Sequence, residues 1–152
     1  MTTVSIETAD QPDARALLEA GERYALSLYP ADSCYLLDVT ELLAPGVTMW
    51  MARSDGGTAL GTVALVDRGD GSAELKRLYV HDEARGLGVA TLLLEELEAH
   101  ARAEGVTRIQ LETGPKQLAA IALYEQRGYR HIENFGPYVG DDFSVCMEKR
   151  LS

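Results

Sequence analysis

The stretch YVHDEARGLGVATLLLEELEAH, residues 79–100, opens with charged residues and two glycines and continues as a leucine-rich pattern. Between Val89 and Glu104, apolar residues recur at intervals of three and four, while charged residues fill the remaining positions. This spacing predicts an amphipathic helix, and Gly105 stands where a glycine commonly ends one. Two glycines and Arg85 therefore stand directly before a helix.

The start of that helix predicts a binding site for an anion. The first backbone amides of a helix lack partners within it, and the helix dipole is positive at this end. Gly86 and Gly88 carry no side chain that would block a ligand, and Arg85 adds positive charge. The segment RGLGVA, residues 85–90, therefore suits a diphosphate group.

Two other kinds of glycine loop do not match this segment. A P-loop would end in Gly-Lys followed by Ser or Thr, and that ending is absent. A dinucleotide fingerprint would need Gly or Ala three residues after Gly88, where Thr91 stands. It would also follow an apolar parallel strand, whereas the preceding ELKRLYV is charged. The motif argues against both nucleotide sites.

Apolar periodicity predicts strands and helices on both sides of the glycine segment. Asp10 is expected to cap the first helix. Hairpins followed by strand–helix–strand crossings predict an α/β (α+β) fold, in which a mixed sheet carries helices on both faces. The predicted strands cover residues 3–9, 47–55, 58–70, 72–80, 106–113, 129–133 and 143–151, and the predicted helices cover 10–29, 39–45, 86–104 and 116–128.

The strand before the glycine segment changes the phase of its apolar residues. Ala73 and Leu75 occupy odd positions, whereas Leu78 and Val80 occupy even ones. An inserted residue would keep all four on one face, so the pattern predicts a β-bulge near residues 76–78. Alternatively, Leu75 or Leu78 points to the other face of a strand that is covered on both sides.

Length and charge narrow the class of protein. A chain of 152 residues is expected to form a single domain, residues 1–152, with a core that needs no disulfide or metal. The formal charge of −10, with only 14 Lys and Arg, argues against nucleic-acid binding. Acidity fits a cationic substrate, and it equally fits plain solubility.

The sequence also bears on the compartment and on metals. It has no signal-peptide pattern and no apolar stretch long enough to cross a membrane, so no membrane association and a cytoplasmic location are expected. Cys34 and Cys146 lie far apart without a nearby pair of histidine ligands, so no metal site is expected.

Two motifs resemble the signatures of the GNAT N-acetyltransferase superfamily. Arg85, Gly88 and Ala90 fit the pattern Q/R-x-x-G-x-G/A, which in that family binds the pyrophosphate of acetyl-CoA. AIALYEQRGY, residues 120–129, resembles the second signature, A-x-x-x-Y-E-x-x-G-F/Y. The order of elements is similar over nearly the whole chain. The resemblance implies one GNAT domain that transfers an acetyl group from acetyl-CoA to an amine.

The family's fold implies where coenzyme A would lie. It has a central, mixed, mostly antiparallel sheet of about seven strands, and a bulged strand splays from its neighbour to open a cleft. Gln117 stands where many relatives carry asparagine, and Lys116 could approach phosphate or remain solvated. The cofactor-binding residues implied by the resemblance are Leu78, Tyr79, Val80, Arg85, Gly86, Leu87, Gly88, Val89, Ala90, Thr91, Gln117 and Tyr124.

The resemblance also assigns catalytic roles. Tyr124 falls on the family's tyrosine, so it is expected to act as general acid, and a phenol with a pKa of about 10 is protonated at neutral pH. The alternative is a core tyrosine. Glu74 is the candidate general base, because some relatives place a glutamate on this strand. Glu112, His81 and a chain of waters compete with it.

The acceptor is expected to be a primary amine of a small molecule, peptide or protein. Tyr138, Asp141 and Asp142 could recognise its ammonium group, or could simply form a hairpin connection. The tyrosines of the N-terminal region could line a pocket or the core. The resemblance allows a homodimer. The competing hypothesis is a regulatory module that binds acyl-CoA without catalysis, although the intact Tyr124 argues against it.

Overall fold

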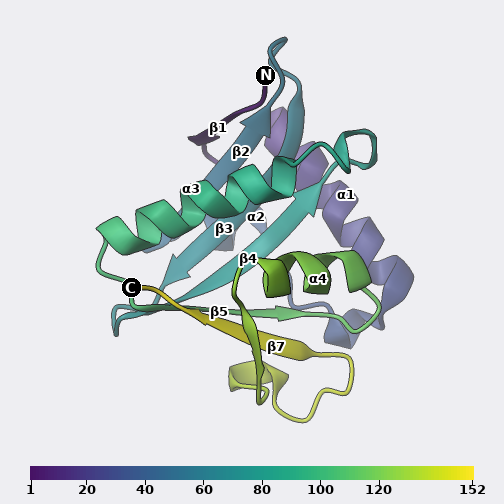
Figure 1. Ribbon diagram of the computed structural model, residues 1–152. Helices are drawn as coiled ribbons and strands as arrows, with labels where there is room; N and C mark the ends of the chain where they lie inside the picture. Colours follow the sequence, from purple (N-terminus) through teal and green to yellow (C-terminus); the bar gives the residue numbers. More distant parts are fainter.

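The computed structural model describes residues 1–152 and contains one seven-stranded sheet in the order β1-β2-β3-β4-β5-β7-β6 (Figure 1). Only β4 and β5 are parallel neighbours, because helix α3 carries the chain from one to the other. The strands are β1 (Thr3–Ile6), β2 (Val47–Arg53), β3 (Ala59–Asp67), β4 (Ser72–Val80), β5 (Arg108–Thr113), β6 (Arg130–Ile132) and β7 (Val145–Arg150). The helices are α1 (Pro12–Leu28), α2 (Val39–Leu42), α3 (Val89–Ala103) and α4 (Leu118–Gln126).

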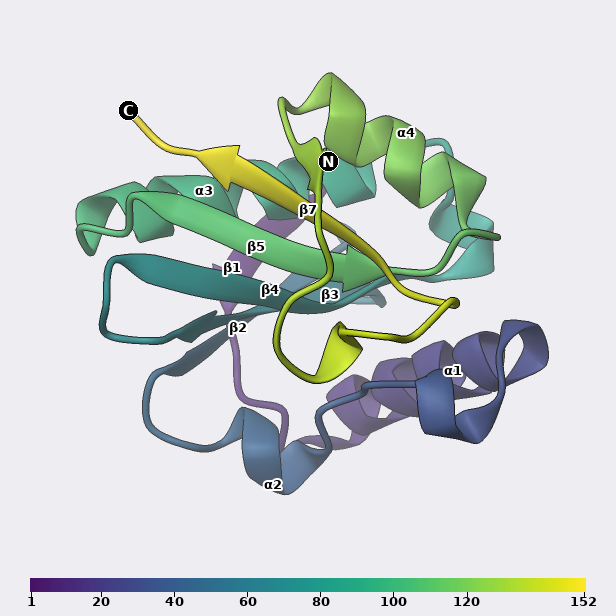
Figure 2. The same cartoon turned by 90° about the horizontal axis from the view of Figure 1, so that it is seen from below.

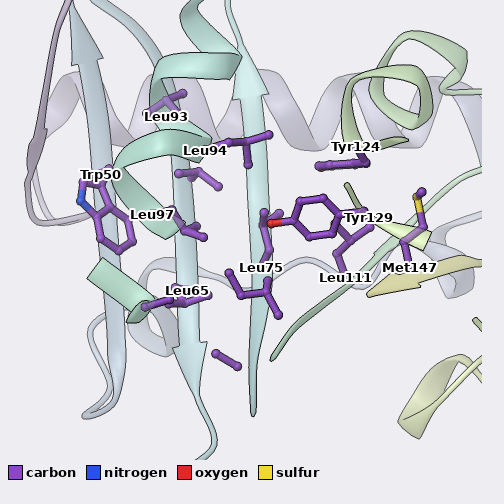
Figure 3. Close-up of a cluster of buried hydrophobic side chains, with 14 of the residues drawn as sticks. Trp50, Leu65, Leu75, Leu93, Leu94, Leu97, Leu111, Tyr124, Tyr129 and Met147 are labelled. Atoms are coloured by element: carbon purple, nitrogen blue, oxygen red, sulfur yellow. The ribbon is translucent and has the colours of Figure 1, made fainter. Parts of the chain in front are cut away.

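Helices cover both faces of the sheet, as the sequence predicts. Figure 2 shows α3 and α4 on one face and α1 and α2 on the other. On the first face, Leu93 and Leu97 of α3 are fully buried over the sheet, where Trp50 and Leu75 lie (Figure 3). On the second face, Leu17 of α1 belongs to a smaller buried cluster. None of the helices combines the length and apolarity that crossing a membrane requires.

The first helix begins differently from the prediction. Asp10 does not cap it, because the helix starts at Pro12 and its N-cap residue is Gln11, whose side chain makes no capping hydrogen bond. Asp10 instead forms an ion pair with Arg15, with 2.7 Å between the carboxylate and the guanidinium. Proline at the first helical position needs no amide partner and has a suitable φ, so it sets the start without a side-chain cap.

The predicted bulge is confirmed in β4. Thr62 of β3 pairs with Tyr79 and Ala64 pairs with Lys76, so two residues of β4 oppose one residue of β3. Arg77 at this point has φ 60°, in the left-handed region that non-glycine residues rarely adopt. The inserted residue brings Leu78 against the same core that buries Leu75. The phase change in the sequence therefore records the bulge.

Strands β4 and β5 separate where the bulge begins. Their parallel pairing runs from Ser72 beside Arg108 to Leu75 beside Leu111 and then stops, although β4 continues to Val80. The edge of β4 that faces β5 therefore lacks a strand partner from Lys76 onward. This is the splayed arrangement that the family resemblance predicts.

Candidate active site

A cavity of about 630 Å3 opens where β4 and β5 separate. Its walls come from α1, residues 33–36, the bulged half of β4, the glycine loop, the end of β5 and α4. Most of the predicted cofactor residues line it. They are Leu78, Tyr79, Val80, Arg85, Gly86, Gly88, Val89, Ala90, Thr91, Gln117 and Tyr124.

The glycine loop leaves space at the start of α3. Gly86 and Gly88 have φ values of 79° and 78°, and a Cβ added to either would meet nothing within 4 Å. Gly88 is the N-cap of α3, no side chain caps this end, and the first turn contains no acidic residue. The first amides of α3 are thus accessible to an anionic ligand. Leu87, the remaining predicted cofactor residue, is 69% exposed and does not line the cavity.

Alanine at position 88 tests this anion site. The methyl group would enter the open space and strain the left-handed backbone, so we expect the KM for acetyl-CoA to rise about tenfold. Gly105→Ala is the matched control, because Gly105 has φ 79° at the other end of the same helix and equally open surroundings. Equal KM values for the two variants would argue against the site.

Arg85 lies at the mouth of the cavity between the glycine loop and α1. Its guanidinium carbon stands 5.1 Å from the centre of the Tyr24 ring and 5.9 Å from that of Tyr79. It also forms an ion pair with Asp82 at 3.0 Å and donates a hydrogen bond to the Val80 carbonyl at 3.4 Å. These contacts hold a positive charge beside the amides of the loop.

Tyr124 reaches the cavity from α4. The residue is 4% exposed, and its ring meets that of Tyr129 edge to face with 5.6 Å between the centres (Figure 3). Burial raises the pKa of Tyr124, and the nearby carboxylate of Glu112 raises it further. The phenol is therefore protonated throughout the neutral range, as a proton donor requires.

Glu112 lies at the end of β5 and lines the same cavity. Burial raises its pKa to about 7, although a hydrogen bond from Ser144 and the charge of Lys76 act in the opposite direction. The Ser144 hydroxyl donates to the Glu112 carboxylate at 2.7 Å. A carboxylate that titrates near neutral pH is suited to accept a proton at physiological pH.

Glu74, the predicted base, does not line the cavity. Its carboxylate accepts hydrogen bonds from Arg68, at 2.8 Å, and from the hydroxyl of Tyr138, and Lys76 Nζ is 3.6 Å away. It stands before the bulge, where β4 is still paired with β5, so the splay does not expose it. The structure brings Tyr124 and Glu112 to one cavity and leaves Glu74 outside.

Two other predicted candidates have local structural roles. His81 Nδ1 accepts a hydrogen bond from the Glu83 amide at 3.2 Å, which stabilises the turn after β4. Gln117 Oε1 accepts hydrogen bonds from the Thr113 hydroxyl at 3.0 Å and from the Gly114 amide at 3.1 Å. The Gln117 oxygen is thus used within the β5–α4 turn, while the residue still lines the cavity.

The same turn is fixed to the end of α1. The Lys116 amide donates to the Tyr29 hydroxyl at 2.9 Å, and Lys116 Nζ donates to the Leu28 carbonyl at 3.1 Å. A Cβ at Gly114 would overlap the Tyr29 ring, so only glycine fits there. This close approach explains the glycine that ends the LETG segment, residues 111–114.

The loop between β6 and β7 contributes less to the cavity than expected. Tyr138 is 1% exposed, and Asp141 accepts a hydrogen bond from the Tyr35 hydroxyl at 2.7 Å. Neither residue, nor Asp142, lines the cavity, whereas Phe143 of the same loop does. The three tyrosines of the N-terminal region, Tyr24, Tyr29 and Tyr35, all line it.

Arg77 and Phe143 are among the lining residues that the sequence interpretation did not assign to the site. The bulge signal at residues 76–78 marked the place of Arg77, but the direction of its side chain depends on the bulge's backbone angles. No pattern in the sequence distinguishes Phe143 from an ordinary loop residue.

Comparisons with known proteins agree with this geometry. The model of the acetyltransferase (GNAT) family matches residues 15–129. An IAA acetyltransferase from Azospirillum brasilense is 40% identical over 150 residues, which cover 98% of this chain and 97% of that protein.

Solved structures show the same arrangement. A crystal structure from Klebsiella pneumoniae subsp. pneumoniae, named as an acyl-CoA N-acyltransferase, has a TM-score of 0.87 and 35% identity, and covers 100% of this chain and 99% of that chain. PaiA N-acetyltransferase from Thermoplasma acidophilum, in complex with coenzyme A, shares the fold at 17% identity and a TM-score of 0.74, with 99% of each chain covered. The chain thus belongs to the GNAT family and is an acetyl-CoA-dependent N-acetyltransferase.

Proposed function

We propose that a primary amine attacks the acetyl group directly in this cavity, with Glu112 as general base and Tyr124 as general acid. One observation carries the assignment. Glu112 and Tyr124 come from different elements and line the same cavity, and the Glu112 carboxylate lies near enough to raise the pKa of Tyr124. Acyl transfer from a thioester to an amine requires a base that accepts the amine's proton and an acid that donates a proton to the leaving thiolate. Both groups must face the same cavity.

The residues at the start of α3 fit the diphosphate of coenzyme A. The amides that follow Gly88 have no capping side chain, and Arg85 places a cation beside them. When bound there, acetyl-CoA supplies an acyl carbon activated as a thioester. Arg85, Gly86, Gly88 and the first residues of α3 would hold the diphosphate, and the backbone of β4 would lie along the pantetheine arm.

The Val80 amide is our candidate for polarising the acyl carbonyl. The amides of successive strand residues point to opposite edges. The His81 amide donates to the Leu60 carbonyl at 2.8 Å, toward β3, so the Val80 amide points toward the gap left by β5. A fixed backbone donor aimed at an oxygen stabilises the charge that develops on it in the transition state.

Glu112 would accept the proton of the attacking amine. An acetyl acceptor must be a neutral amine, so the base is needed where most amines are protonated. With a pKa of about 7, Glu112 is half ionised at neutral pH and fully ionised above it. We propose Glu112 in preference to Glu74, whose oxygens are occupied by Arg68 and Tyr138.

The acceptor is an amine, and an activity screen would identify which class of amine it is. Thiol release should be measured over primary amines that include amino acids, polyamines and peptide N-termini, and separately with the IAA named for the Azospirillum relative, which has no primary amino group. We expect release with at least one class of primary amine. Saturable binding of acetyl-CoA with no thiol release in the presence of any amine would instead favour the non-catalytic acyl-CoA-binding module.

Phenylalanine in place of Tyr124 tests the proton donor. We expect turnover to fall about 100-fold while the affinity for acetyl-CoA changes less than twofold, because the ring remains and only the hydroxyl that donates the proton is lost. Tyr129→Phe is the matched control, since this neighbouring tyrosine directs its hydroxyl to Glu98, at 3.0 Å, rather than to the cavity. Unchanged turnover in the Tyr124 variant would remove it as the acid.

A further inference from the structure

The charges that line the cavity are opposite in sign to those of the whole protein. The chain carries a formal charge of −10, yet four of the cavity-lining residues are cationic and only Glu112 is anionic. A positively charged wall favours anionic groups of a ligand. The cationic lining residues are Lys76, Arg77, Arg85 and Lys116.

Two of these cations lie near a carboxylate, whereas Lys116 is exposed and reaches only a backbone carbonyl. Lys76 Nζ donates to the Tyr35 carbonyl at 2.8 Å and to the Tyr138 hydroxyl at 2.9 Å. Arg85 is paired with Asp82, and Lys116 Nζ donates to the carbonyl of Leu28. Lys76 and Lys116 tie parts of the cavity wall together, and Arg85 lies beside the glycine loop proposed to bind the diphosphate.

Arg77 is different. Its guanidinium makes one hydrogen bond, from Nη2 to the Leu18 carbonyl at 2.6 Å, and no carboxylate lies within 4.0 Å of it. Burial lowers its pKa, and the charge of Glu22 on α1 opposes this shift only from a distance. An arginine stays charged in such surroundings, and its planar group has donors left for a carboxylate.

The backbone at this position does not explain an arginine. With φ 60°, residue 77 sits in a conformation that glycine and asparagine adopt more readily. The strained bulge nevertheless directs the guanidinium toward α1, where it bonds the Leu18 carbonyl, and Arg77 lines the cavity together with Leu18 and Leu36. The same three residues also border a second, smaller pocket that contains Glu19, Glu22 and Asp38. Strain retained at a cavity points to a function for the side chain.

We propose that Arg77 binds a carboxylate of the acceptor, so that the substrate is an amine that also bears a carboxylate, as an amino acid does. This rests on the proposed acetyl transfer at the same cavity. Glu112 would face the amino group, Arg77 the carboxylate, and the apolar side chains of Leu36 and Phe143 the remainder of the molecule. A planar two-oxygen anion suits the forked guanidinium better than it suits a lysine.

Matched acceptor pairs test the proposal: phenylalanine with phenethylamine, and 4-aminobutyrate with propylamine. The wild-type protein is expected to prefer the carboxylate-bearing member by at least tenfold in kcat/KM. Arg77→Asn, which suits the left-handed backbone, should lower kcat/KM for that member about 100-fold, mainly through KM, and change the other less than twofold. Arg77→Lys should restore part of the preference.

Binding of the products gives a second measurement that does not need turnover. In the presence of coenzyme A, calorimetry should show N-acetylphenylalanine binding at least tenfold more tightly than N-acetylphenethylamine, and Arg77→Asn should remove the difference. No preference in the wild-type protein, or an equal loss for both members, overturns the proposal and leaves Arg77 a structural residue of the bulge. Preferential binding of the acid without any thiol release would instead overturn the transferase function.

Discussion

Replacement of Glu112 by glutamine is expected to lower kcat by about 100-fold to 10,000-fold at pH 8. Glutamine keeps the size of the side chain and can still bond with the Ser144 hydroxyl, but it cannot accept the amine's proton. Cofactor affinity should change little, because Glu112 lies at the end of β5 rather than at the glycine loop. Steady-state kinetics together with calorimetry of acetyl-CoA measure both quantities.

The pH profile makes this expectation more specific. Because the pKa of Glu112 is about 7, the wild-type kcat/KM should rise with pH up to that value and then level off with respect to this group. The residual activity of Glu112→Gln should lack that rise. Glu74→Gln is the matched control, since it changes the other carboxylate of the same region and should leave the rise in place. Loss of the rise in the Glu74 variant alone would make Glu74 the base.

Although Glu112→Gln should lower activity, it should raise the stability of the protein. The pKa of Glu112 is higher in the folded protein than the ordinary 4.5, so the folded state binds the proton more tightly than the unfolded chain does. The favourable contribution is present at low pH and is lost as pH rises through about 7. At pH 8, Glu112→Gln should therefore raise the free energy of unfolding, on the order of 1 to 3 kcal/mol. Denaturant titration at pH 8 measures it.

The second large effect concerns Glu98, far from the chemistry. The residue is 1% exposed on α3, and its carboxylate binds Arg127 at 2.7 Å, Lys149 at 2.9 Å and the Tyr129 hydroxyl at 3.0 Å. Two of these partners follow α4 and one belongs to β7, so a single carboxylate joins α3 to both of these elements. Glu98→Ala should lower the free energy of unfolding by about 3 to 5 kcal/mol, because two cations lose a buried partner.

Glu95→Ala is the control for Glu98→Ala. Glu95 is on the same helix and 3.8 Å from the same Arg127, but its side chain is 52% exposed. An exposed pair contributes at most about 1 kcal/mol, so this variant should unfold nearly like the wild type. Similar losses in both variants would mean that the buried carboxylate contributes no more to stability than an exposed one.

The sequence predicts the fold well where the signal is local. Strand and helix periods gave the order of elements, and the phase change between Leu75 and Leu78 located the bulge, because each depends on residues close together in the chain. The predicted N-cap of α1 was wrong by one residue. Asp10 and Gln11 are both acceptable before a helix, and proline at position 12 decided between starts one residue apart.

The carboxylate that faces the cavity is harder to predict. Glu74 and Glu112 both lie on strands of the same region, and nothing in their neighbouring residues separates them. The difference arises only after β4 and β5 pair through Leu75 and Leu111 and then diverge. Glu112 follows the last pair and opens into the cavity, whereas Glu74 precedes it. The position of a divergence between strands that are distant in sequence has no local signal.

The close approach of Tyr29 to Gly114 also bears on how acceptor preference can change between relatives. Because no side chain fits at position 114, the Tyr29 ring at the end of α1 packs directly against the backbone that follows β5. A larger residue there would displace α1 and with it Tyr24, which contacts Arg85. We therefore expect divergence of acceptor preference to proceed through residues 33–36 and the β6–β7 loop, while this joint keeps the two halves of the cavity at a constant spacing.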